Sequence, residues 1–422
     1  MGDVRNLPKG IQHERIAGTV LSGLAILYAI TILLSHSAAY FAVAGLALFA
    51  IIIWRRTGGV AATFSRLRVP LLSLAAFVVW EILSRVLNGK QPTFAPFDDA
   101  PVLFSSLLLF GLTFDPGKKK EAAVKAVLVV SAASSLVVLL GILQHVTGLT
   151  YPLPKQPLRD GKLYGFFRYY IQAGCTFSTL AVFFSFLALY WRTSRTRRIM
   201  LGISAAFMFA GTVMTFARTY FLSLLGSLVL VFTRKSLRTA VLGATAMAAV
   251  IAIVFALFPP VRSRAASIFD VHKNPSNVER LYLMRIAADI ITDHPVIGVG
   301  QREWEHTAGA YSTPYRKDWN FSEALYAHAH NVYLTVASET GLVGLALFLT
   351  FWLSVAVLLL RKTPGGQGTT SWALNQGTGY ALINLFMGGV FDESLRRPLS
   401  FLCIAFLIAV ALLARDAPDE KV

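Results

Sequence analysis

Apolar runs long enough to cross a lipid bilayer recur along the whole chain, and no other feature of the sequence constrains its fold so strongly. Apolar residues occupy 55% of the 422 positions and charged residues only 14%, which leaves too little polar surface to coat a water-soluble particle. We therefore predict an all-α polytopic integral membrane protein, with one transmembrane domain over residues 1–422. At roughly 20 apolar residues per span, we predict about twelve transmembrane helices, at 16–34, 38–54, 69–87, 100–115, 122–144, 172–191, 199–216, 218–233, 239–258, 332–360, 373–391 and 398–414.

Positively charged residues cluster in alternate short connections between these spans, and such clusters usually lie in the cytoplasm. They fall at 55–68, 118–120, 192–198, 234–238 and 361–362. An even number of spans then places both termini in the cytoplasm and the long loop 259–330 on the opposite side. Residues 199–233 join two clusters, so we predict a helical hairpin whose tip lies near Arg218, the only charged residue in that stretch.

Charge, cysteine content and the N-terminal stretch each argue against a class of protein. We assign the net charge of +17 mainly to topology and to contact with anionic lipid, and we expect no nucleic-acid partner. Cys175 and Cys403 lie inside apolar runs and are predicted to be packing residues. The polar N-terminal stretch leads into a full-length span without a small-residue cleavage site, so we expect no removed signal peptide.

The long loop contains a predicted helix near 277–293. Ser276-Asn-Val-Glu279 forms a capping box, and apolar residues then recur at three- and four-residue intervals. Arg285 has a partner at i+4 in Asp289, which favours a structural salt bridge. Arg280 has no such local partner, so its charge must meet water, another segment or a ligand.

A polar cluster, Tyr326-Ala-His328-Ala-His330-Asn331, directly precedes the tenth predicted span. An imidazole at this position can accept a proton from a hydroxyl nucleophile. His328 and His330 can also ligate zinc, although no third ligand follows at a recognised spacing. Polar residues at a helix start often cap free backbone N–H groups, and position alone favours this structural role slightly.

Two motifs in the chain resemble those of the O-antigen ligase family. One is an Arg followed after three residues by Leu, present as Arg218-Thr-Tyr-Phe-Leu222. The more specific motif is His-Asn, nine residues, Gly, two residues, Gly, present as His330-Asn331 with Gly341 and Gly344. By themselves, the two glycines are more typical of close helix packing than of substrate binding. The predicted spans and long loop also resemble the family architecture, so the likeness covers the whole chain.

The resemblance implies a GT-C-like enzyme of the bacterial inner membrane with its active site on the periplasmic face. Its donor is a glycan on undecaprenyl pyrophosphate, its acceptor a sugar hydroxyl of the lipid A core, and it requires no metal or other cofactor. On this basis we predict that Arg218 and Arg280 bind the pyrophosphate, while His330 acts as general base in a single inverting step. We assign supporting roles to Arg168, His328, Asn331 and Asp392, although Asp392 is by itself more typical of a solvated loop charge.

Two alternatives remain open from the sequence. An O-antigen polymerase or a protein O-oligosaccharyltransferase uses the same class of donor. Because the chemistry is similar, the residues in the sequence distinguish these enzymes poorly from a ligase. A transporter or flippase of lipid-linked glycans would also have many spans and a basic outer vestibule, but it predicts ionisable residues near the bilayer midplane.

Overall fold

The computed structural model describes residues 60–92, 116–150, 156–257, 275–321, 328–363, 366–396 and 398–415, with isolated positions between 19 and 33. The described parts are almost entirely helical. The strands β1 (Leu158–Arg159) and β2 (Lys162–Leu163) form a two-residue antiparallel hairpin, in which Leu158 pairs with Leu163. The all-α prediction is therefore confirmed for the described part of the chain.

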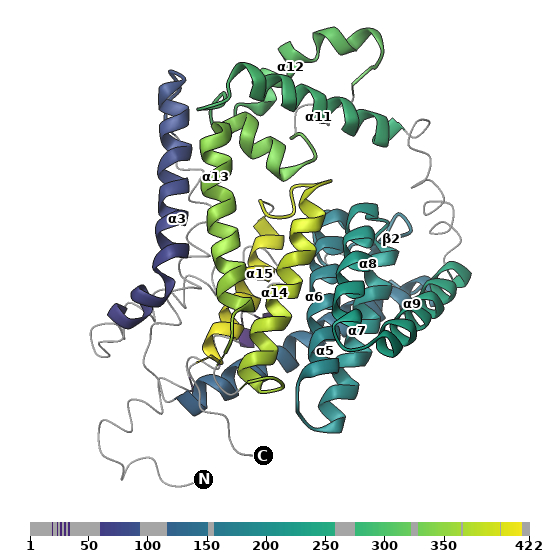
Figure 1. The fold of residues 1–422 in the computed structure, drawn as a ribbon. Helices are drawn as coiled ribbons and strands as arrows, with labels where there is room; N and C mark the ends of the chain where they lie inside the picture. The colour runs from purple at the N-terminus through teal and green to yellow at the C-terminus, as the bar shows by residue number, and fades with distance from the viewer. Residues whose placement is uncertain are drawn as a thin grey trace.

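The helices are α3 (Val60–Leu87), α5 (Pro116–Thr147), α6 (Tyr170–Tyr190), α7 (Arg195–Met214), α8 (Arg218–Thr233), α9 (Leu237–Leu257), α11 (Pro275–Asp293), α12 (Trp304–Tyr311), the 3-10 helix η4 (Thr313–Lys317), α13 (Val332–Leu360), α14 (Thr370–Gly389) and α15 (Pro398–Leu413). α11 and α12 lie across one end of the bundle, and α3 runs beside α13 (Figure 1). The helix predicted near 277–293 is α11.

The predicted spans agree with these helices wherever the structure describes them. The predictions at 38–54 and 100–115 lie outside the described residues, and the one at 16–34 falls there except for isolated positions. Six of the described helices are long and apolar enough to cross a membrane, and α8 and α15 are shorter apolar helices. The total of twelve spans and the side on which each loop lies remain predictions.

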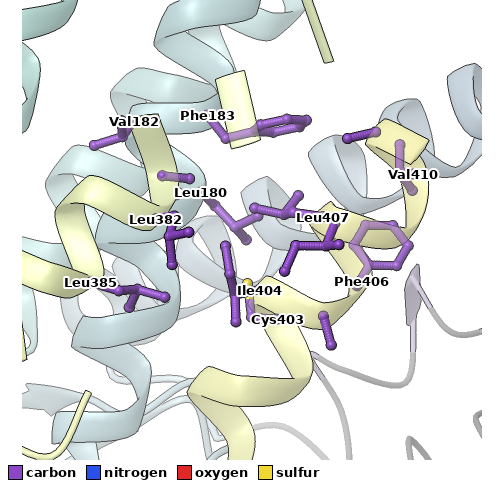
Figure 2. Close-up of a cluster of buried hydrophobic side chains, with 14 of the residues drawn as sticks. Leu180, Val182, Phe183, Leu382, Leu385, Cys403, Ile404, Phe406, Leu407 and Val410 are labelled. Carbon is purple, nitrogen blue, oxygen red and sulfur yellow. The ribbon is translucent and has the colours of Figure 1, made fainter. Parts of the chain in front are cut away.

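α6 forms the centre of the bundle. Its residues from Ala173 to Leu187 are buried on every face, as expected of a helix that is apolar all round. Figure 2 shows one part of this core, where α6 meets α14 and α15. Cys403 is a core residue here, and Cys175 is buried in α6; neither is in a disulfide, which agrees with the predicted packing role.

α14 is less apolar than its neighbours because it buries amide side chains. Asn375 donates to the carbonyl of Ala411 at 2.8 Å, Gln376 to that of Leu360 at 2.8 Å, and Asn384 to the hydroxyl of Ser178 at 3.0 Å. Each bond joins α14 to a different helix. These amides therefore help to specify which helices pack together, which apolar contact alone does poorly in lipid.

α13 contains a break at Gly341, and the segment after α11 docks into it. Gly341 has φ +71°, and a Cβ there would overlap the carbonyl of Val296. The N–H groups of Val299 and Gly300 donate to the carbonyls of Ser338 and Glu339 at 3.0 and 2.8 Å. Gly341 therefore does serve close packing, but it receives a loop and not a second helix.

Candidate active site

Arg218 and Arg280 line the same cleft at the end of the bundle covered by α11. Its empty volume is about 370 Å³. The lining residues come from four separate stretches of the chain: Tyr170, Ile171, Phe216, Ala217, Arg218, Thr219, Tyr220, Arg280 and Asp392. Two guanidinium groups that the sequence separates widely are thus brought to one cleft.

The position of Arg218 follows from the turn between α7 and α8. α7 ends at Met214 and α8 begins at Arg218 itself, so the predicted hairpin turns where its only charge lies. Phe216 has φ +60°, and the Thr215 hydroxyl accepts from the N–H of Ala217 at 3.3 Å. A tight turn of this kind places the first side chain of α8 at the end of the helix, away from the apolar core.

Arg280 reaches from α11 to two other segments. Its Nη1 donates to the hydroxyl of Thr219 at 3.1 Å and to the carbonyl of Phe391 at 3.2 Å. The expectation that this charge must leave its own helix is confirmed. A guanidinium has five N–H donors. Because both bonds use Nη1, Arg280 keeps donors on Nε and Nη2 that no acceptor among the described residues takes up.

The two histidines form a compact unit just before α13. The backbone N–H of His330 donates to Nδ1 of His328 at 3.0 Å, and the ring centroids are 4.3 Å apart. His330 has φ +53°, a left-handed conformation that is uncommon outside glycine. His328 thus fixes the backbone of His330 in an unusual conformation.

The protonation of His328 follows from these contacts. Nδ1 of His328 also lies 3.8 Å from Oε1 of Glu393. Nδ1 cannot both accept the backbone N–H of His330 and donate a proton to this carboxylate. The 3.0 Å bond has normal hydrogen-bond geometry and the 3.8 Å contact does not, so we assign the proton to Nε2.

Asp392 connects the arginine cleft with the histidines. It is only 1% exposed, it lines the cleft, and its Oδ2 accepts from the Tyr220 hydroxyl at 2.8 Å. One ligand-type atom each from Asp392, His328 and His330 lie within 4.8 Å of one another. The reading of Asp392 as a solvated loop charge is therefore wrong, because the α14–α15 loop folds inward. The same loop supplies the third metal-ligand type that sequence spacing did not offer.

Glu393, beside Asp392, is also buried. Its Oε1 accepts from the hydroxyl of Thr335 at 2.5 Å. Burial raises the pKa of Glu393 to about 7, against the lowering influence of Arg396 and of this hydrogen bond. Glu393 therefore changes its charge near neutral pH, next to the histidine pair.

Arg396 and Glu339 form an ion pair that the sequence reasoning missed. Nη1 of Arg396 lies 2.9 Å from Oε2 of Glu339. Burial opposes the charge of Arg396, but the carboxylates of Glu339, Glu393 and Glu81 raise its pKa above the ordinary value. The sequence assigns the positive charges mainly to topology and to anionic lipid, but the partner of Arg396 in the structure is protein. The missed signal was Glu339 itself, an ionisable residue inside a predicted span.

Two other predictions at this end of the bundle have different outcomes. Asn331 caps α13, since its side-chain oxygen accepts from the N–H groups of Tyr333 and Leu334 at 3.0 Å each. Arg168 is exposed, lies over the ring of Tyr169 at 5.2 Å and does not line the cleft, although Tyr170 and Ile171 do.

The predicted salt bridge between Arg285 and Asp289 is not formed. Asp289 instead accepts from the Tyr315 hydroxyl at 2.6 Å, and the Arg285 guanidinium lies 5.7 Å from the ring centroid of Tyr282. The segment that contains η4 packs against α11 and supplies the partner of Asp289, which helix spacing alone cannot anticipate, while Arg285 lies over a ring of its own helix.

Comparison with known proteins agrees with the motifs. Residues 180–349 match the family model described as O-antigen ligase. A search of curated proteins found no match. The matched range contains Arg218, Arg280 and His330, and it supports glycosyl transfer of the ligase or polymerase type on lipid-linked polysaccharide by a membrane protein. The resemblance to the O-antigen ligase family is thus supported by a family match over residues 180–349.

Proposed function

We propose that the chain is an O-antigen ligase, which transfers polysaccharide from undecaprenyl pyrophosphate to a sugar hydroxyl of the lipid A core. The reaction takes place on the periplasmic face of the bacterial inner membrane. The observation that carries this proposal is one cleft lined by Arg218, Arg280 and Asp392, with Asp392 beside His330. The cations and the base that such a transfer needs are thus adjacent.

In this proposal the two arginines bind the pyrophosphate of the donor. A guanidinium presents paired N–H donors that match phosphate oxygens, and these charge-assisted bonds are stronger than neutral ones. Negative charge grows on the leaving pyrophosphate as its bond to the anomeric carbon breaks, so donors already held in place favour the transition state. The bonds of Arg280 to Thr219 and Phe391 supply that preorganisation.

His330 removes the proton from the acceptor hydroxyl as that oxygen attacks the anomeric carbon. The attacking oxygen enters opposite the leaving pyrophosphate, so the anomeric configuration inverts in one step. The proton moves from the hydroxyl to the imidazole, which becomes a cation. Asp392 is the carboxylate placed to stabilise that cation, while His328 holds the backbone of His330 and is a positioning residue.

The proposed mechanism uses no metal. His328, His330 and Asp392 are residue types that ligate metals, but Nδ1 of His328 and Oδ2 of Asp392 already accept hydrogen bonds. We expect a chelator to leave transfer unchanged. Loss of transfer with a chelator, and its return on addition of Zn²⁺, would contradict this part of the mechanism.

The acceptor decides between the ligase and its relatives. Purified protein is incubated with a lipid-linked glycan and, in separate reactions, with lipid A core, a second lipid-linked glycan or a hydroxyl-bearing peptide. We expect a new glycosidic bond only to the lipid A core. Chain extension on the second glycan identifies a polymerase, and a glycosylated peptide identifies a protein transferase.

A transporter is tested in reconstituted vesicles. It moves the lipid-linked glycan across the bilayer without forming a new glycosidic bond, whereas a ligase consumes the donor when the acceptor is present.

A further inference from the structure

A second pocket lies at the opposite end of the same helices. Its empty volume is about 600 Å³, and it is lined by Arg234, Leu360, Arg361, Lys362, Trp372, Gln376, Tyr380 and Ile383. α8 runs from Arg218, in the first cleft, to the residue before Arg234 in this one, a distance of roughly 24 Å for a helix of this length. α14 joins the two ends as well, since it begins beside this pocket and leads into the loop of Asp392 (Figure 1).

The second pocket has three cations and no carboxylate. Arg234, Arg361 and Lys362 line it, and all three are exposed. Within the part of the chain that the structure describes, none of them forms a salt bridge. An uncompensated group of three positive charges around a concave surface attracts an anion with several negatively charged oxygens.

Aromatic rings hold one of these cations in place. The Arg234 guanidinium lies 5.7 Å from the ring centroids of both Trp372 and Tyr380, and its Nη1 donates to the Tyr380 hydroxyl at 3.0 Å. These contacts orient Arg234 without neutralising it, because neither ring carries a negative charge. Gln376 is also fixed, since it donates to the carbonyl of Leu360 at 2.8 Å.

Topology and helix dipoles account for only part of this arrangement. Basic residues commonly flank the cytoplasmic ends of spans, and cations interact favourably with helix C-termini such as those of α8 and α13. Neither effect requires a cavity, and neither requires Trp and Tyr to form one of its walls. Trp and Tyr concentrate where lipid headgroups meet the hydrocarbon region.

We propose that this pocket binds the phosphate of an anionic lipid headgroup. Arg234, Arg361 and Lys362 contact the phosphate oxygens, and Trp372 and Tyr380 pack against the apolar part of the lipid next to the headgroup. The site needs only that the bundle lies in a membrane. It does not depend on glycosyl transfer at the other end.

The test measures lipid binding by the purified full-length chain in neutral detergent, by native mass spectrometry. The lipids are phosphatidylglycerol, which is anionic, and phosphatidylcholine, which carries a phosphate but no net charge. We expect retention of phosphatidylglycerol by the wild type and about a tenfold loss of affinity in Arg361→Gln/Lys362→Gln. Both residues are exposed, so the variant should fold, and its melting temperature in the absence of lipid checks this.

The matched control is Arg195→Gln/Arg197→Gln, which removes the same charge from exposed positions at the same end, outside the pocket. We expect this control to change affinity less than twofold. An equal loss in the control, equal binding of phosphatidylcholine, or full competition by millimolar inorganic phosphate would each overturn the proposal. The last outcome would identify a site for a soluble anion.

Discussion

Arginine has different surroundings in the two pockets at the ends of the bundle. Arg280 is held by a hydroxyl and a carbonyl from two other segments, and a buried carboxylate, Asp392, lies in the same cleft. Arg234 is held against aromatic rings, and the other cations of its pocket, Arg361 and Lys362, are neighbours in sequence. Both arrangements depend on the tertiary fold, but only the first places a buried carboxylate beside its cations.

This difference teaches what each pocket is suited for. A guanidinium fixed beside an acid and two histidines can direct a proton and a leaving group at defined positions. A set of exposed cations, of which one lies against aromatic rings, attracts an anion without the same control of geometry. Substitutions at the first pocket should therefore affect catalysis, and those at the second should affect lipid binding.

The largest expected effect is that of His330→Ala. Removal of the base should lower polysaccharide transfer by roughly 10²- to 10⁴-fold, while Arg361→Gln/Lys362→Gln at the other end should leave transfer in detergent within about twofold. The measurement is transfer to lipid A core at matched protein levels. Near-normal transfer by His330→Ala would eliminate the assigned base and the contrast between the pockets.

Substitution of Arg280 should have the next largest effect. Arg280→Ala should lower transfer about 10²-fold, because a donor that we propose to bind the leaving pyrophosphate is lost. Arg280→Lys should recover only part of this, since an ammonium lacks the paired donors of the guanidinium. Arg285→Ala on the same helix is the control, and we expect a mild effect because Arg285 lies over Tyr282. Equal losses for both arginines would indicate a role in folding alone.

Substitutions of His328 test whether this residue positions His330 or takes part in catalysis itself. We expect His328→Ala to lower transfer about tenfold, because the backbone of His330 loses its acceptor. His328→Asn should restore most of the activity with an unchanged pH profile, since the amide oxygen can take the place of Nδ1. If the Asn variant is as impaired as the Ala variant, His328 itself takes part in proton transfer.

Substitution of Glu393 should have a smaller effect, which concerns how the stability of the fold depends on pH. A carboxyl whose pKa is raised from 4.5 to about 7 on folding binds its proton more tightly in the folded state. Its contribution to stability is therefore complete below pH 4.5 and is lost as pH rises through 7. We expect the melting temperature of Glu393→Gln to fall less than that of wild type between pH 5 and 8. Parallel curves would contradict the raised pKa.

Much of the fold follows from the sequence because apolar runs of spanning length specify helices. The turn beside Arg218 was predictable in the same way, since a single charge in a long apolar stretch has to lie at an end. The outward reach of Arg280 was predictable from the missing i+4 partner. These inferences use only neighbours along the chain.

The acidic half of the site was not predictable in this way. Asp392 and Glu393 stand in a short polar loop, and their burial depends on how α14, α15 and α13 pack. Arg285 and Asp289 had the right spacing for a pair, yet Asp289 accepts from Tyr315 of η4 and Arg285 lies over Tyr282 of its own helix. The contacts of Asp392, Glu393 and Asp289 come from other segments of the chain.

The break at Gly341 gives a mechanical reason for the spacing of the His-Asn and Gly-Gly motif. The first part of α13 runs from Val332, just after His330 and Asn331, to the break at Gly341. At that break it receives the segment that follows α11. Each residue of an α-helix advances its azimuth by about 100°. One residue more or fewer between Asn331 and Gly341 would thus rotate His330 away from the helix that carries Arg280, so the nine-residue interval sets the orientation of the proposed base relative to Arg280.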